Sequence, residues 1–156
     1  LFCQQAVVSL TANNISVSNN IPLFNLVVES KVDVFGIQFE ISFDTTQINF
    51  ANIYPIIEGF TFAAKEDNNV IKGILFSLKG IELLKADNVA NLLSIEFEVK
   101  EEFSGETSLD FQTIILAGEY GQDIDVVTVP IKYSNTGLPF PADSIPEPDT
   151  LIFPED

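Results

Sequence analysis

Most titratable side chains in this chain are carboxylates. The 156 residues include 23 Asp and Glu, seven Lys, one Cys and no His. Without His, neither a Ser–His–Asp nor a Cys–His arrangement can be assembled, and the usual zinc sites lack their imidazole ligands. Two carboxylates would suffice for glycoside hydrolysis. The chain has no Trp and only three Tyr to stack on a sugar ring, so we expect no enzyme.

One short motif could suggest catalysis. Phe43-Asp44-Thr45-Thr46 is similar to the Asp-Thr-Gly of aspartic proteases, but Thr46 stands where that motif needs Gly, and no second copy occurs. We expect Asp44 to end its strand and to cap the turn that follows.

Oxygen ligands for a divalent cation gather at two places. One is Glu66-Asp67-Asn68-Asn69 and the other is Asp123-Ile124-Asp125. Neither has the spaced acids, central Gly and distal Glu of an EF-hand loop. Solvated turns explain both clusters without a metal. Calcium at Asp67, or at Asp123 and Asp125, is thus an open alternative, and we expect no other cofactor.

The charge balance limits the partners. A net charge of −16 repels nucleic acid phosphates and anionic lipid surfaces. No apolar run approaches the roughly 20 residues of a membrane helix. The sequence therefore predicts neither nucleic acid binding nor membrane insertion.

The stretch VFGIQFEISFD at residues 34–44 shows how the chain folds. Successive side chains of a strand point to opposite faces, so this alternation predicts a strand with one buried face. The buried face carries Ile37, Phe39, Ile41 and Phe43, and the other face carries Gln38, Glu40 and Ser42.

Most other segments also read as strands. Period-2 apolar runs bounded by turn residues lie at about 6–10, 15–17, 21–29, 48–53, 57–64, 70–79, 92–99, 107–116 and 124–133. We expect a polar turn at 65–69 and a loop with local helix at 80–88. Many short strands without a long helix predict an all-β fold, a two-sheet β-sandwich with jelly-roll topology.

The sequence divides into three parts. Residues 1–5 form an N-terminal extension, 6–133 the sandwich, and 134–156 a Pro-rich acidic tail with a short terminal strand. An isolated tail gains nothing by exposing its apolar residues, so we expect these to dock, either on their own domain or by adding a strand to a neighbouring subunit. They are Leu138, Phe140, Leu151, Ile152 and Phe153.

The N-terminal residues bear on localisation. The chain contains no Met, and removal of a secretory leader is the economical explanation. Cys3 has no second Cys to pair with inside the chain. It is therefore either a free thiol or the site of a covalent link to another molecule. We expect a secreted protein at the cell surface.

Several segments taken together carry a family resemblance. Phe35–Asp44, Gly59-Phe60, the strand at 70–79, Leu92–Lys100, Gly105 and Thr107–Phe111 follow one another in the order of a cohesin-type domain. The resemblance spans about residues 6–133. It implies a jelly-roll binding module whose third strand lies in the sheet that meets a calcium-loaded dockerin. By position, that face would include Gln38, Glu40, Ser42, Leu75 and Ser77.

Two functions remain open, and both are non-enzymatic. In the first, the chain is a structural subunit that associates with other copies of itself through terminal strand exchange, as in a filament or surface appendage. In the second, it is a monomeric recognition module that binds a dockerin-like or other secreted protein through its sheet face. The apolar tail favours the first.

Overall fold

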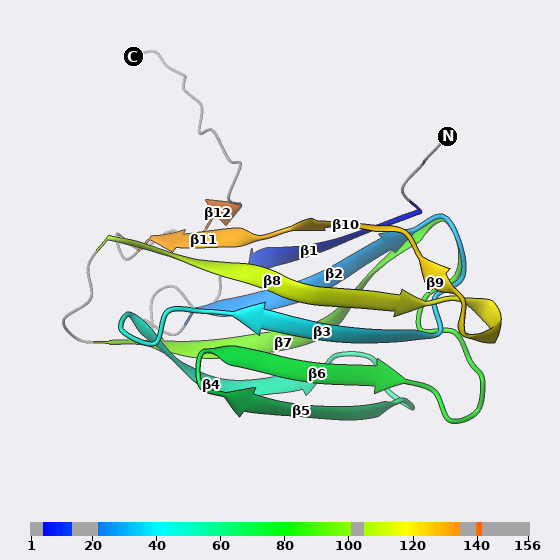
Figure 1. The fold of residues 1–156 in the computed structure, drawn as a ribbon, viewed down its shortest axis with the longest axis horizontal. Coiled ribbons are helices and arrows are strands. Elements are labelled where there is room, and N and C mark those ends of the chain that lie inside the picture. The colour runs from blue at the N-terminus through cyan, green and yellow to red at the C-terminus, as the bar shows by residue number, and fades with distance from the viewer. Residues whose placement is uncertain (1–4, 14–21, 101–104, 135–139, 142–156) are drawn as a thin grey trace, which may run out of the picture.

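The computed structural model describes residues 5–13, 22–100, 105–134 and 140–141, and these form two β-sheets packed face to face (Figure 1). The first sheet has the order β10 (Val126–Val129), β1 (Ala6–Asn13), β2 (Leu23–Ser30), β7 (Asn88–Val99) and β4 (Ile48–Pro55). The second has the order β12 (Phe140–Pro141), β11 (Ile131–Ser134), β8 (Glu106–Ala117), β3 (Gly36–Ser42), β6 (Val70–Phe76) and β5 (Thr61–Asp67). The short β9 (Asp123–Ile124) pairs with β8. The predicted all-β sandwich is confirmed.

The core fills the space between the sheets. Inward side chains alternate along each strand, as the period of 2 requires, and Ile37, Phe39, Ile41 and Phe43 are all buried as predicted. At one end of the core, the Phe97 ring contacts Phe24, Phe43 and Phe50 edge-on, at centroid distances of 5.9, 5.3 and 6.2 Å. Edge-to-face pairs stabilise beyond the area that they bury, so this aromatic cluster ties the two sheets together.

The segment at 126–134 passes from the first sheet to the second. β10 runs parallel to β1 in the first sheet, and β11 then pairs with β8 in the second. Pro130 lies between them and cannot donate a ladder hydrogen bond, so the strand breaks there. The single strand predicted at 124–133 is therefore wrong, because the chain forms three short strands over this range.

Two other local predictions also need correction. Lys65, Glu66 and Asp67 belong to β5, and only Asn68-Asn69 forms the turn, with Asn68 at a φ of 61°. The residues at 80–88 contain no helical turn. They hold a β-bridge from Leu84 to Val34 instead. Within the described residues, the short 3₁₀ turn Glu119–Gly121 is the one helical element, and no helix is long and apolar enough to span a membrane.

Gly73, which has no side chain, determines how β6 packs against β3. Gly73 lies directly opposite Phe39 in the register of the two strands, and both face the core. A Cβ at residue 73 would lie 2.3 Å from Phe39 Cζ, so the ring occupies the space that any side chain there would need. This pairing keeps Leu75 inward, opposite Ile37, and leaves Ile74 outward, opposite Gln38.

We expect Gly73→Ala to destabilise the fold by about 1–3 kcal/mol, because overpacking forces the Phe39 ring off its preferred rotamer. Denaturant unfolding measures the loss. Gly36→Ala is the matched control, since a Cβ there meets its nearest atom at an ordinary 3.5 Å. Equal stability of the two variants would show that the packing of the Phe39 ring does not require a residue without a side chain at position 73.

Candidate protein-docking face

Rows of side chains run across four strands on the outer side of the second sheet, and the two middle rows are the candidate site. Residues directly opposite each other in an antiparallel register share a face, so the pairings of β8, β3, β6 and β5 define each row. The first row is Ile115, Gln38, Ile74 and Ala63, and the second row is Thr113, Glu40, Lys72 and Lys65. We call these eight residues the outer face.

The first row is mostly apolar although it faces solvent. Ile115 and Ile74 lie on either side of Gln38, and their exposed fractions are 43% and 38%. Ile74 forms part of the wall of a shallow groove of about 390 Å³ that crosses β3, β6 and β5, and Ile115 lies on β8, on the other side of Gln38. The walls of the groove are Gln38, Glu40, Ala63, Lys65, Lys72 and Ile74. The face thus combines two exposed isoleucines with a hollow beside them.

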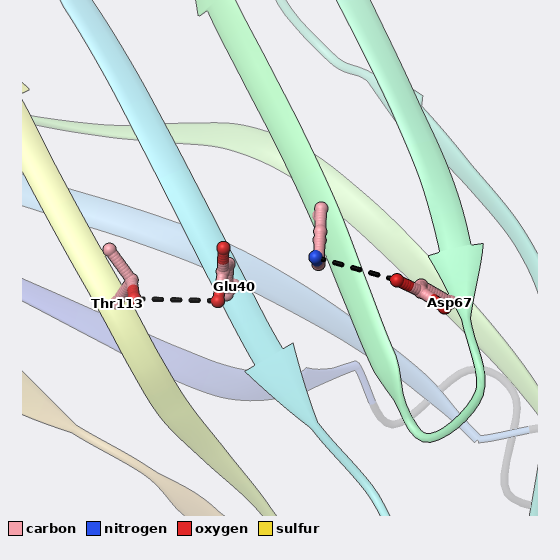
Figure 2. A network of polar contacts seen from close by, with 4 residues as sticks. Glu40, Asp67 and Thr113 are labelled. Carbon is pink, nitrogen blue, oxygen red and sulfur yellow. Dashed lines mark hydrogen bonds and ion pairs between the residues drawn. The ribbon is translucent and has the colours of Figure 1, made fainter.

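The second row is charged. Thr113 Oγ1 donates a hydrogen bond of 3.4 Å to Glu40 Oε1, and Lys72 Nζ lies 3.5 Å from Asp67 Oδ2 (Figure 2). No lysine lies within ion-pair distance of Glu40 among the residues that the structure describes. Lys65 and Lys72 are direct cross-strand partners, and like charges in that position repel each other. The row therefore has a negative and a positive half.

The structure places the five residues predicted for the docking face in three kinds of position. Gln38 is exposed, and Glu40 and Ser42 are half-buried, on the solvent side of β3 as predicted. Leu75 is wrong as a face residue, because it is 0% exposed and lies in the core opposite Ile37. Ser77 lies beyond the end of β6, and its hydroxyl accepts hydrogen bonds from the backbone N–H groups of Lys79 and Ile81.

Several outer-face residues were missed. Ile74 shares the outer face with Val70 and Phe76, on the opposite side of β6 from Leu75. Ile114 and Ile115 are adjacent apolar residues, so their sequence does not tell which one points outward. A β-bulge in β8 opposite Glu40 and Ile41 adds one residue to the alternation, and Ile115 therefore lies opposite Gln38 on the outer face.

Most residues of the predicted assembly tail lie outside the described part of the chain. These are Leu138, Leu151, Ile152 and Phe153, and Cys3 lies outside it as well. Phe140 belongs to β12, which pairs with β11 of the same chain through Lys132 and Ile131. Strand exchange through the tail therefore stays a prediction.

The calcium candidates do not gather further acidic ligands. Among residues 5–13, 22–100, 105–134 and 140–141, no group of three or more Asp, Glu, His or Cys side chains could hold a metal ion. Asp67 pairs with Lys72. Asp125 contributes backbone groups, since its carbonyl accepts from the N–H groups of Gln5 and Ala6.

Asp44 forms the turn that was predicted for it. Its Oδ1 accepts hydrogen bonds from Thr46 Oγ1 at 2.6 Å and from Thr46 N at 2.9 Å, which makes an Asx turn between β3 and β4. These bonds, first the hydroxyl and then the amide, lower the pKa of the Asp44 carboxyl below 3.8, and Lys100 adds a smaller effect. Asp44 also lines a polar concavity of about 660 Å³ with Ser42, Asn68, Asn69 and Asp110.

Solved structures identify the fold. No family model matches this sequence, and no curated protein sequence matches it. A cohesin module of a Clostridium perfringens family 33 glycoside hydrolase is similar at 13% identity and a TM-score of 0.66, over 84% of this chain and 95% of that chain. A non-cellulosomal cohesin of Archaeoglobus fulgidus is similar at 14% identity and a TM-score of 0.63, over 81% and 87%.

A third similar structure is a type I cohesin–dockerin complex of Clostridium thermocellum. It matches at 12% identity and a TM-score of 0.65, over 82% of this chain and 98% of that chain. These likenesses show that the chain has the fold of a cohesin module. The resemblance expected from the pattern of Phe35–Asp44 and the strands after it is thereby confirmed.

Asp44 leads to a prediction about acid stability. Because its pKa is lowered on folding, its contribution is complete above the unfolded value and is lost as the pH falls through the folded one, below about 3.8. Asp44→Asn keeps an oxygen acceptor for Thr46 but cannot titrate. We expect the melting temperature of the wild type to fall more between pH 6 and pH 3 than that of the variant. Equal falls would contradict this role.

Proposed function

We propose that this protein is a non-enzymatic recognition module that docks a protein partner on the outer face of its second sheet. The observation that carries the proposal is the exposure of Ile74 and Ile115 beside the groove. Covering these two side chains would gain about 25 cal/mol for each Å² of apolar surface that is removed from water. A partner that covers this row recovers that free energy.

The composition of the face fits a protein partner. An apolar centre with charged and polar residues around it is the usual anatomy of a protein–protein contact. In the outer face, Ile74, Ile115 and Ala63 supply the apolar centre, and Glu40, Lys72 and Lys65 supply the charges. Lys72 lies opposite Glu40 in the register but pairs with Asp67, and Glu40 forms no ion pair among the described residues, so it can still accept a Lys or Arg from a partner.

The comparisons support the same class of partner. One similar structure is a cohesin in complex with a dockerin, and a dockerin-like module is therefore the first candidate. Cohesin-type domains are binding modules, which agrees with the lack of His and of sugar-stacking aromatics in this sequence. We place the module outside the cell or on its surface.

Self-association through the tail is the second candidate. The apolar tail residues Leu151 to Phe153 favour it in the sequence, but β12, the one described strand of the tail, pairs with β11 of the same chain. We therefore rank docking on the sheet face above strand exchange.

Binding assays with calcium-loaded dockerin modules test the docking proposal. We expect at least one module of a representative panel to bind in isothermal titration calorimetry. The double variant Ile74→Asp/Ile115→Asp should weaken that complex at least a hundredfold, because it buries two charges in the contact.

Val89→Asp is the matched control. Val89 is an exposed aliphatic residue of β7 in the first sheet, with an exposed fraction of 59%. Its substitution should leave binding unchanged. If the double variant bound as tightly as the wild type, the docking face would lie elsewhere. If no dockerin module bound, the dockerin class would be excluded.

A further inference from the structure

We propose that the outer face also pairs with the same face of a second copy of this chain, in a two-fold symmetric dimer. A homodimer of this kind needs a surface that is complementary to itself. If residue i of one copy contacts residue j of the other, then residue j of the first copy also contacts residue i of the second. The two rows of the outer face have this property in both shape and charge.

The shape follows from the strand order. Consider a two-fold axis that lies in the interface, runs along the strands and passes between β3 and β6. This axis places β3 of each copy over β6 of the other, and β8 of each copy over β5 of the other. Each row therefore faces the same row of the second copy with its four residues in the reverse order. The exposed Ile115 of one copy then lies over Ala63 of the other, beside the groove that Gln38, Ile74 and Ala63 line. Symmetry makes this contact twice.

The charges follow the same exchange. In the second row, the axis places Glu40 of each copy over Lys72 of the other, and Thr113 over Lys65. Glu40 has no lysine within ion-pair distance among the described residues of its own chain. The second copy brings a cation to each of the two Glu40 side chains. Lys72, which pairs with Asp67 of its own chain, gains a second anion at the same time.

One contact at the rim opposes the dimer. Asp110, Ser42, Val70 and Asp67 lie across from one another on the same four strands, so the axis brings Asp110 toward Asp67 of the second copy. Both side chains are exposed, and salt screens such pairs. The net charge of −16 also repels at long range, and at 0.15 M ionic strength this repulsion fades beyond about 8 Å. The dimer is therefore weak and reversible.

The dimer and the docked partner would use the same face, so each excludes the other. Pairing of two copies would cover Ile74 and Ile115 until a partner competes for them. The dimer itself does not depend on the proposed docking function, because a chain that never binds a dockerin could still pair.

Sedimentation equilibrium of the full chain tests the proposal, at 0.15 M salt and with a reductant that prevents a Cys3 disulfide. We expect a concentration-dependent monomer–dimer equilibrium. Glu40→Lys and Lys72→Glu should each weaken the dimer about tenfold or more, since each places like charges in contact and 1.4 kcal/mol corresponds to tenfold. Asp110→Asn should strengthen it.

Mixing the two charge variants gives the decisive measurement. Glu40→Lys presents two cations and Lys72→Glu presents two anions at the same contact, so an equimolar mixture should form a heterodimer although neither variant pairs with itself. Glu98→Lys is the control, because Glu98 is exposed on β7 in the first sheet and the substitution changes the net charge equally.

Two results would overturn the dimer. The first is a wild type that stays monomeric up to its solubility limit, which would leave partner docking untouched. The second is a dimer that Glu40→Lys and Lys72→Glu do not weaken or that their mixture does not restore, which would place the contact elsewhere, as in the tail.

Discussion

The packing of the Phe39 ring over Gly73 is the contact on which the rest of the second sheet depends. The ring fills the core beneath a residue that has no side chain, and a Cβ at residue 73 would overlap it. A slip of one residue in the β3–β6 register would turn every β6 side chain to the other face. It would also place a larger side chain beneath the ring. The contact therefore holds Leu75 and Ile71 in the core and Ile74 and Lys72 in solvent.

The outer face owes its character to that register. The strand order of the sheet then places Ile115, Gln38, Ile74 and Ala63 in one row, and Thr113, Glu40, Lys72 and Lys65 in the next. The chain carries a net charge of −16, yet two of its seven lysines stand opposite each other here. Repulsion between them costs stability in the free protein. Asp67, 3.5 Å from Lys72 Nζ, offsets part of that cost.

The sequence pattern was informative where one face of a strand is clearly apolar and the other clearly polar. In β3, the alternation of Ile37, Phe39 and Ile41 with Gln38, Glu40 and Ser42 predicted both faces correctly. In β6, Ile71, Leu75, Ile74 and Phe76 make both faces apolar, and Gly73 interrupts the inward row. The pattern therefore favoured the wrong face, and Leu75 was mistaken for a docking residue. In β8, the bulge opposite Glu40 and Ile41 changes the alternation in the middle of the strand.

By itself, the sequence determined the all-β class, the buried face of β3, the turn at Asp44 and the lack of His. These depend on local periodicity, on a side chain that bonds two residues away, or on composition alone. Only the tertiary structure decided which isoleucines face solvent, that Lys65 and Lys72 are partners, and that Glu40 stands beside Lys72 without an ion pair to any described residue. The first and the last depend on the register of β3 with β6 and β8, strands that are far apart in sequence, and the second depends on the two-residue turn of the β5–β6 hairpin. A register is set by packing in the core, here by one ring over one glycine, and not by the residues that it brings to the surface.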